Sequence, residues 1–356
     1  MMWEISRALG PERVRCLTGV PAREVGNVDG VVIYRAPRAF RGNIMLRSGS
    51  LALSLSQIFH KWRPKVLQAA TCYDASIPLF LKRRVRIPFI IYAHGNEILE
   101  AAKDCWDIPR QALCEASCVL ACSRFTASLV ADIGVSPQRI IRLNPGCDPD
   151  RFRPQQITDR GLTRVNSSGP VILTVGNLVQ RKGQDMVIHA IYRLRKELPD
   201  LQYVIVGDGP YRSTLEQLVS GLGLQSQIVF AGRVDDKILP QYYAAADVVV
   251  MASRQRLDAS DVEGFGITFL EAAACAKPVI AGRSGGSSDA VIDGETGLLV
   301  DPENSADIAD ALSQLLRDPL RVMRMGEQAR KRVLMEFTWK HVAARVANVI
   351  EQVGAS

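Results

Sequence analysis

The sequence predicts an α/β protein made of two successive open domains with parallel sheets, and three observations support this class. The chain has 356 residues, more than one ordinary hydrophobic core supports, so two domains are expected. Short, almost continuous apolar runs alternate with helical patterns, as in βαβ units. This alternation stops at residues 154–169, a polar segment rich in small residues, and then restarts. We therefore predict a first domain over residues 1–158, a linker, and a second domain over residues 168–337.

The first half contains the elements of one such domain. Its beginning, MMWEISRALGPERV, has the spacing of an amphipathic helix and lacks the apolar region and cleavage site of a signal peptide. Gly134 is expected to end a helix that begins at residue 124. The other expected helices are 51–62 and 77–84, and strands are expected at 31–35, 65–70, 87–95, 118–123 and the start of 139–154.

The second half repeats the alternation of strands and helices. Strands are expected at 171–175, 203–206, 227–232, 247–253, 279–282 and 297–302. Helices are expected at 185–198, 211–223, 238–246, over about 304–336, and from residue 338 to the end of the chain. In open sheets of this kind, ligands bind outside the carboxyl ends of the strands, and the cleft between two domains is the favoured place.

Charge is distributed unevenly along the chain. Residues 1–165 hold 24 Lys and Arg against 14 Asp and Glu, whereas the formal charge of the whole chain is only +7. The densest basic run is FLKRRVRIPF, with Lys82, Arg83, Arg84 and Arg86. It is either the solvated end of a helix or a patch for anionic lipid headgroups. Nucleic acid is a poorer candidate partner, because the run lacks interleaved aromatic residues for base stacking.

Cysteine usage and hydropathy limit the class of protein. No apolar run approaches the roughly 18–20 residues that a membrane span needs. Eight scattered cysteines in a large chain favour reduced thiols and a cytoplasmic location. The spacing of Cys114, Cys118 and Cys122 fits no zinc pattern, so we expect core packing and no metal.

The stretch DVEGFGITFLEAAACAKPVIAGRSGG, residues 261–286, carries the strongest local signal. Two acids, Glu263 and Glu271, flank a glycine-rich turn that opens a short apolar helix, which Pro278 is expected to end. The backbone N–H groups of Ile267 and Thr268 would face out of the helix N-terminus and could bind an anion. The pattern favours a nucleotide that carries a hydroxylated group such as a sugar. The alternative is a helix with an acidic cap and a surface glutamate.

Three further loops follow strands. GNLVQRKG (176–183) adds the cations Arg181 and Lys182 to a helix start, which suits a diphosphate, although an exposed basic helix terminus is the alternative. His94 in YAHGNE is either a structural hydrogen-bonding residue or a residue of the cleft. The glycines of VGDGP and AGRVDD, including Gly207, allow close approach to a flat base, although such turns are common.

Taken in order, YAHG, ACSRFT, NPGCDPDRFRP, VGNLVQRKG, VGDGP, AGRV, EGFGITFLE with GG, and DGETGLLVDP resemble a retaining glycosyltransferase of family 4. The Glu-x7-Glu pair with RKG upstream is the most specific part. Within the family the chain is most similar to bacterial mannosyltransferases acting on phosphatidylinositol-type lipids, chiefly through SRQRLDASDVEGFGITFLEAAACAKPVIAG. The resemblance covers the chain from its first helix to its last.

The resemblance implies the GT-B fold, with two Rossmann-like domains facing across a cleft. The donor would lie mainly on the second domain and the acceptor on the first, to which the final helix, 338–356, would return. The resemblance also implies a role for each matching residue. Lys182 would hold the donor diphosphate, and Glu271 would bind the ribose. Glu263 and the N–H groups of Phe265 and Gly266 would contact the transferred sugar. The backbone at Val234 would contact the base, and His94 would lie beside the reacting sugar. Gly176, Asn177, Arg181, Gly207, Ile267 and Thr268 complete the expected donor site.

The implied reaction transfers a hexose, with mannose as the first candidate, from a nucleotide-diphosphate sugar to a lipid-linked or glycan acceptor. It retains configuration and needs no metal or cofactor beyond the donor. The basic first half fits peripheral contact with an anionic membrane, at the inner face. The alternatives are a nucleotide-sugar epimerase, a phosphorylase, for which a pyridoxal-phosphate lysine motif is missing, or a nucleotide-sugar-binding remnant without turnover.

Two positions depart from the family pattern. The family usually has arginine where this chain has Asn177, so one cation of the diphosphate site is missing unless Arg181 replaces it. Family members also begin with a strand and a Gly-rich loop, whereas MMWEISRALG matches the helix that follows them. We therefore expect a first domain that lacks its N-terminal strand, and a chain that folds poorly or is inactive as written.

Overall fold

The computed structural model describes residues 1–10, 13–18, 26–28, 31–35, 63–103, 108–155, 169–256 and 260–355. The helix expected at 51–62 and most of the expected linker lie outside these ranges. The chain forms two compact units. Unit 1 comprises Met1–Cys122, Ala127–Leu143 and Trp339–Ser356, and unit 2 comprises Ser123–Thr126 and Asn144–Thr338. The chain thus passes from unit 1 to unit 2 between Leu143 and Asn144, before the segment expected as the linker.

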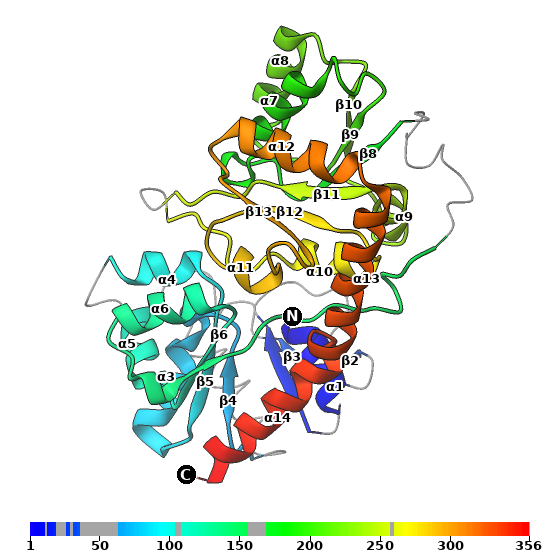
Figure 1. Ribbon diagram of the computed structural model, residues 1–356. Helices are drawn as coiled ribbons and strands as arrows, with labels where there is room; N and C mark the ends of the chain where they lie inside the picture. The colour runs from blue at the N-terminus through cyan, green and yellow to red at the C-terminus, as the bar shows by residue number, and fades with distance from the viewer. Residues whose placement is uncertain are drawn as a thin grey trace. The chain divides into compact units, whose positions relative to one another are not determined.

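Unit 1 contains two sheets (Figure 1). In the first, β1 (Arg15–Thr18) pairs in parallel with β3 (Val31–Arg35), which pairs antiparallel with β2 (Gly26–Val28). The second is fully parallel in the order β4 (Leu67–Ala69), β5 (Phe89–Ala93), β6 (Cys118–Ala121), β7 (Ile140–Arg142). The helices are α1 (Met2–Leu9), α3 (Ser76–Val85), α4 (Asn96–Ala101), α5 (Ile108–Glu115), α6 (Arg124–Asp132) and α14 (Trp339–Ala355), with short 3-10 turns at Cys72–Ala75 and Pro137–Arg139.

The four-stranded sheet of unit 1 is buried on both faces, as a parallel sheet must be. All five residues of β5 are buried. One face packs against apolar residues of α3 to α6 and the turn that precedes α3. The other packs against α1 and α14, where Ile5, Tyr92 and Val346 belong to one core cluster. Cys118 and Cys122 are buried and Cys114 is half-buried, so these thiols serve as packing residues.

Unit 2 has one six-stranded parallel sheet in the order β10-β9-β8-β11-β12-β13. Its strands are β8 (Val171–Val175), β9 (Gln202–Val206), β10 (Ile228–Gly232), β11 (Val248–Met251), β12 (Val279–Gly282) and β13 (Gly297–Val300). Its helices are α7 (Gln184–Leu194), α8 (Arg212–Leu222), α9 (Leu239–Ala245), α10 (Ile267–Ala274), α11 (Ser287–Ala290), α12 (Ser305–Leu316) and α13 (Pro319–Glu336), and a 3-10 turn spans Gln180–Lys182. The chain therefore builds the sheet outward from its middle, first to one edge and then to the other.

Helix α10 ends earlier than the sequence suggests. We expected Pro278 to end it, but its last residue is Ala274. The chain leaves the helix through Ala276, which has a φ of +56°. Residues other than glycine seldom adopt this left-handed conformation, and here it ends the helix before Pro278. Pro278 then only precedes β12.

Candidate functional site

The two loops that carry the sequence motifs follow adjacent strands at the middle of the unit 2 sheet. Strands β8 and β11 pair in parallel, with Val249 opposite Leu173. After β8 the chain continues toward one edge of the sheet, and after β11 toward the other. The strand order reverses at this pair, and ligands of open α/β sheets bind beyond the carboxyl ends of the strands at such a switch point. The topology thus brings the 176–183 loop and the segment after β11 to the expected binding position.

The two loops pack against each other through their backbones. The Arg254 N–H donates to the Arg181 carbonyl at 2.9 Å. Gly183 has a φ of +71°, and a Cβ there would lie 2.0 Å from the Ala252 carbonyl oxygen. Only glycine fits this contact. The basic loop is therefore fixed on the end of β11 before any ligand binds.

Glu263 is the centre of a buried polar cluster. Its Oε2 accepts hydrogen bonds from Lys182 Nζ at 2.6 Å, Arg181 Nη1 at 2.8 Å and Ser253 Oγ at 3.2 Å. Burial alone would raise the pKa of this carboxyl, but the charges of Lys182 and Arg181 outweigh it and hold the pKa below its usual range. Glu263 is therefore ionised at neutral pH, and it pairs with both cations of the loop.

Two further ion pairs support the cluster. Arg181 Nε donates to Asp261 Oδ1 at 2.6 Å, so its guanidinium is held by two carboxylates. Arg254 donates through Nη2 to both carboxylate oxygens of Asp185, at 3.1 and 2.8 Å. Because Asp185 lies in the first turn of α7, this pair ties the helix behind the basic loop to the segment after β11.

Glu271 has different surroundings, although it belongs to the same stretch of chain. Its Oε2 accepts a hydrogen bond from the hydroxyl of Tyr243, on α9, at 2.6 Å. Burial raises the pKa of Glu271 to about 7, which the Tyr243 hydrogen bond lowers only in part. Tyr243 is fully buried, and its ring packs edge-on against Phe152 with 5.7 Å between ring centroids. Glu271 is thus a carboxyl whose charge changes near neutral pH.

The start of α10 has the open N-terminus that the sequence predicts. Gly266 precedes the helix with a φ of +94°, and a Cβ there would lie 2.4 Å from the Phe269 ring. Within the described residues, no side chain caps this helix. Phe265 is buried against Phe337, with ring centroids 5.9 Å apart, which fixes the turn from behind. The Thr268 hydroxyl oxygen is buried and has no hydrogen-bond partner among the described residues.

The remaining expected donor residues line the neighbouring strand ends. The Gly176 N–H donates to Val206 at 2.9 Å, and that of Gly207 to Gly232 at 2.8 Å. Asn177 is exposed, and its carbonyl accepts from Gln184 Nε2 at 3.2 Å. Val234 is half-buried in the loop after β10.

His94 belongs to unit 1, directly after β5. Its Nε2 lies 3.0 Å from the Ala70 carbonyl oxygen, and its backbone N–H donates to Glu97 Oε1 at 2.5 Å. A carbonyl can only accept, so Nε2 carries the hydrogen and Nδ1 of the neutral ring is left as an acceptor.

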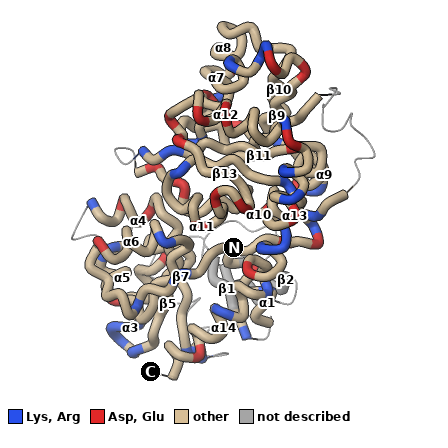
Figure 2. The backbone as a smooth tube through the Cα atoms, viewed as in Figure 1, with Lys and Arg blue, Asp and Glu red and all other residues tan. Residues whose placement is uncertain are grey.

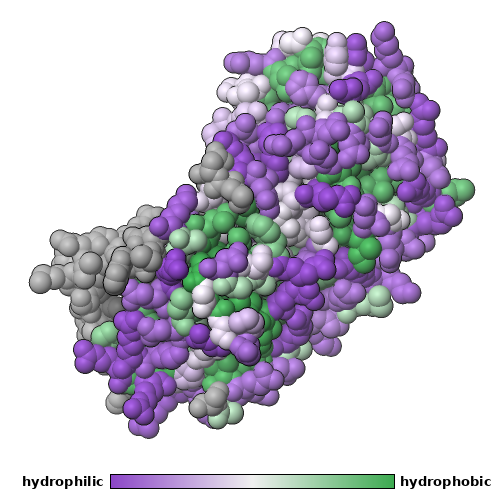
Figure 3. All heavy atoms as spheres, turned by 60° about the vertical axis from the view of Figure 1, so that its left-hand side comes forward, coloured by the Kyte–Doolittle hydropathy of each residue, from purple (hydrophilic) through white to green (hydrophobic). Residues whose placement is uncertain are grey.

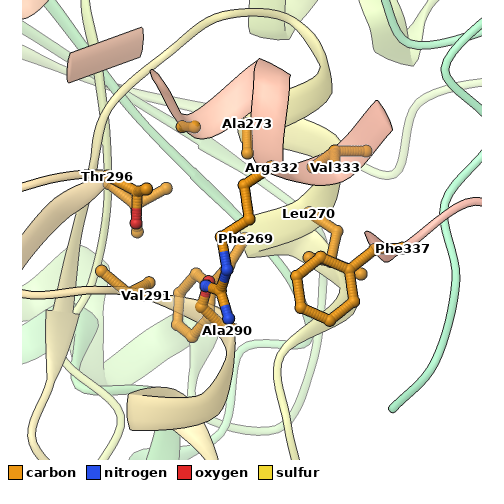
Figure 4. A pocket seen from close by; sticks show the side chains of 11 residues that line it. Phe269, Leu270, Ala273, Ala290, Val291, Thr296, Arg332, Val333 and Phe337 are labelled. Atoms are coloured by element: carbon orange, nitrogen blue, oxygen red, sulfur yellow. The ribbon is translucent and has the colours of Figure 1, made fainter. Parts of the chain in front are cut away.

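A small cavity lies behind α10 and is separate from the Glu263 cluster (Figure 4). Its volume is about 10 Å³, room for about one water molecule. The Arg332 guanidinium extends into it and donates to the carbonyls of Ala290 at 2.8 Å and Asp289 at 2.9 Å. This space is a packing gap around a paired arginine. Within the described ranges, no group of three or more His, Cys, Asp and Glu side chains could hold a metal ion.

Several residues of the cluster were not predicted from the sequence. Asp261 and Ser253 lie near Glu263 in the chain, but nothing local indicates that they face the loop at 176–183. Tyr243 was assigned only to an expected helix. The pair of Asp185 and Arg254 joins residues far apart in the sequence. Ser253, Arg254 and Asp185 share one signal, a polar side chain close after a buried strand or at the start of the next helix, whereas Asp261 and Tyr243 lack it.

Comparison with known families matches both halves of the chain. Residues 155–332 match the family model described as glycosyl transferases group 1. Residues 1–151 match the model described as glycosyltransferase family 4.

Curated relatives match over part of their length. A GDP-mannose-dependent alpha-(1-6)-phosphatidylinositol monomannoside mannosyltransferase of Mycolicibacterium smegmatis is 40% identical over 238 residues, which are 66% of this chain and 62% of the relative. A D-inositol 3-phosphate glycosyltransferase 2 of Catenulispora acidiphila is 34% identical over 234 residues, 63% of this chain and 53% of that protein. The chain thus spans less than two thirds of the length of these relatives.

Solved structures share the fold along nearly the whole chain. A sucrose-phosphate synthase of Thermosynechococcus elongatus superposes with a TM-score of 0.82 at 22% identity, covering 99% of this chain and 92% of that one. The Anabaena protein HepE, solved in complex with UDP, gives a TM-score of 0.79 at 19% identity, with coverages of 99% and 95%. These similarities and the parallel sheets of the two units identify the fold as GT-B and confirm the expected fold class.

Proposed function

Because the chain belongs to the group 1 glycosyl transferases, we propose that it transfers a hexose, with retention of configuration, from a nucleoside-diphosphate sugar to a lipid or glycan acceptor. Mannose is the first candidate sugar and a phosphatidylinositol-type glycolipid the first candidate acceptor, because the relative from Mycolicibacterium smegmatis carries these in its name. The observation that carries the proposal is the Lys182–Glu263 cluster at the switch point of the unit 2 sheet.

The donor would bind along the strand ends of unit 2. Lys182 has two N–H groups beyond the one that it gives to Glu263, and these would hold the diphosphate. Backbone N–H groups at the start of α10 would add to this site, because a helix N-terminus attracts anions. Glu271 would accept hydrogen bonds from the ribose, and the backbone at Val234 would contact the base. The donor would also lie close to the backbone of Gly176, Gly207, Phe265 and Gly266.

Catalysis in this proposal rests on electrostatic support of the departing diphosphate. Charge develops on the diphosphate as its bond to the sugar breaks, and Lys182 and the α10 N–H groups would stabilise that charge. Glu263 would contact the sugar hydroxyls. His94 would accept a hydrogen bond from the sugar through Nδ1, since its Nε2 hydrogen faces Ala70.

The test is a product screen. The purified chain is incubated with GDP-mannose, UDP-glucose and other nucleotide sugars together with a lipid extract, and the products are analysed by mass spectrometry. We expect one hexose to be added to a lipid. A changed sugar nucleotide without any adduct would favour an epimerase. Donor binding without turnover would favour a binding remnant, and either result would contradict the proposal.

We also propose that unit 1 contacts an anionic membrane surface through the end of α3. Phe80 and Val85 are each 56% exposed, and Arg84 and Arg86 are exposed beside them. Figure 2 shows basic positions at the end of this helix, and the face drawn in Figure 3 is mostly hydrophilic with smaller hydrophobic patches. Exposed apolar side chains beside cations suit the boundary between lipid headgroups and acyl chains. Within the described residues, no helix is long and apolar enough to cross a membrane.

Vesicle sedimentation tests this surface. Replacing both Arg84 and Arg86 by Glu should reduce binding to phosphatidylinositol-containing vesicles by at least about tenfold, since each basic residue near an anionic surface contributes about 1 kcal/mol. The control makes the same charge change at two exposed residues of α13, Arg324→Glu with Lys331→Glu. Equal losses from both double variants would indicate nonspecific charge attraction, and no loss from either would refute the surface.

A further inference from the structure

Arg181 differs from Lys182 in how it is held. Its Nε donates to Asp261 and its Nη1 to Glu263, so one guanidinium bridges two carboxylates. Only 14% of its side chain is exposed, and Asp261 is 31% exposed on the outer side of the pair. A planar guanidinium fixed at two positions on its edge loses the freedom to turn toward a ligand.

The hydrogen bonds of Glu263 are unequally divided between its two oxygens. Oε2 receives all three donors, from Lys182, Arg181 and Ser253. Within the described residues, Oε1 accepts no hydrogen bond. It is not fully buried, so it can still contact solvent. The protein therefore holds one oxygen of this carboxylate through three donors and leaves the other without a hydrogen bond.

The charges in the cluster also balance without a ligand. Arg181 and Lys182 carry two positive charges, and Asp261 and Glu263 carry two negative ones. A group that serves mainly to attract a diphosphate would gain from unpaired positive charge, and Arg181 has none. The sequence left open whether Arg181 replaces the arginine missing at Asn177, and these contacts favour another role.

We propose that Arg181, anchored by Asp261, is a positioning residue that orients Glu263 so that Oε1 faces the hydroxyls of the transferred sugar. This role rests on the proposed function and deepens it. The diphosphate is then held by Lys182 and backbone N–H groups, and the arginine acts only through Glu263.

Calorimetric titration with two ligand pairs separates the two roles: GDP with GDP-mannose, and UDP with UDP-glucose. For Arg181→Gln we expect affinity for the preferred nucleotide sugar to fall by at least about tenfold, and affinity for the matching nucleoside diphosphate by less than about threefold. Lys182→Gln should weaken both ligands by at least about tenfold. Arg256→Gln is the matched control, because this nearby arginine donates to Gln180 and not to Glu263, and both affinities should stay within about twofold of the unmodified protein.

Asp261→Asn separates the two roles through the nucleotide sugar. Removing this anion leaves the cluster with a net positive charge, which favours an anionic diphosphate under either role. If Arg181 positions Glu263, the loss of its anchor should make affinity for the nucleotide sugar fall relative to affinity for the matching nucleoside diphosphate. Equal changes in the two affinities in Asp261→Asn, or equal losses of both ligands in Arg181→Gln, would overturn the proposal.

An NMR titration of the Glu263 carboxyl tests the positioning without any ligand. Its pKa should rise in Arg181→Gln, because this change removes a cation that donates to Glu263, and should stay unchanged in Arg256→Gln. An unchanged Glu263 pKa in Arg181→Gln would refute the role. If the unmodified chain binds neither ligand pair, the proposed function fails, whereas the NMR result still decides the role of Arg181.

Discussion

Glu263 and Glu271 belong to one motif, yet the protein gives them opposite properties. Glu263 accepts from two cations, and its pKa lies below the usual range. Glu271 accepts from a neutral phenol, and burial raises its pKa to about 7. Both side chains are removed from most solvent, so the difference comes from the charge of the partners. The first acid is fixed as an anion, and the second can gain or lose its charge under physiological conditions.

The largest expected effect comes from removing a cation beside Glu263. In Lys182→Ala the diphosphate loses a charge-assisted hydrogen bond, so affinity for a nucleoside diphosphate should fall by about 30- to 100-fold. The pKa of Glu263 should rise toward that of Glu271, since one of its two cations is gone. Calorimetry and an NMR titration measure the two effects. Unchanged affinity would remove Lys182 from the site.

Folding stability should reveal the raised pKa of Glu271. The pKa of this carboxyl is about 7 in the folded protein and near 4.5 in the unfolded chain. Its contribution to folding stability is therefore complete below the unfolded pKa and is lost as the pH rises through the folded pKa. Relative to Glu271→Gln, the unmodified protein should therefore lose stability between pH 5 and pH 8, on the order of 2 kcal/mol. Urea unfolding of both proteins at several pH values tests this. Parallel pH profiles would contradict the raised pKa.

Donor affinity should follow the same titration in the opposite direction. Ribose hydroxyls donate hydrogen bonds, and an ionised Glu271 accepts them better than a protonated one. Affinity for a nucleotide sugar should rise by up to about tenfold from pH 6 to pH 8 in the unmodified protein and stay flat in Glu271→Gln. A nucleotide sugar is the right probe, because it lacks the terminal phosphate that titrates near pH 6. The same pH slope in both proteins would assign the effect to another group.

The smallest effect is expected from Tyr243→Phe. This change removes the hydrogen bond that partly lowers the pKa of Glu271. The midpoint of the pH-dependent affinity should move upward, with a loss of about two- to fivefold at pH 7. Calorimetry over the same pH range detects the shift. A downward shift would show that Tyr243 does not stabilise the charged form.

The fold was largely predictable because most strands are buried on both faces. β5, β8 and β11 are continuous apolar runs bounded by turn residues, and this pattern has few other interpretations. The two short strands β1 and β2 were missed because they contain polar residues and glycine and follow no such run. The end of α10 was placed too late, because proline is an obvious helix breaker and a left-handed alanine gives no warning in sequence.

The motifs predicted which residues belong to the candidate site, but not which residues they contact. Lys182 and Glu263 were expected near one ligand, but their direct contact depends on β8 and β11 lying side by side. The pKa of Glu271 depends on Tyr243 from another helix, which no local pattern connects to it. Sequence motifs select the candidate ligand-binding residues, whereas the order of the strands decides which residues form hydrogen bonds with them.

The position of α14 determines the order in which the protein can form during synthesis. Apart from Ser123–Thr126, unit 2 is one continuous segment, Asn144–Thr338, and can fold as soon as that segment leaves the ribosome. Unit 1 has to wait, because Val342, Val346 and Val349 of the last helix belong to the same core cluster as Ile5. The part of unit 1 around Ile5, although synthesised before unit 2, therefore reaches its native packing after it, and a nascent chain stalled before residue 339 would leave that core incomplete.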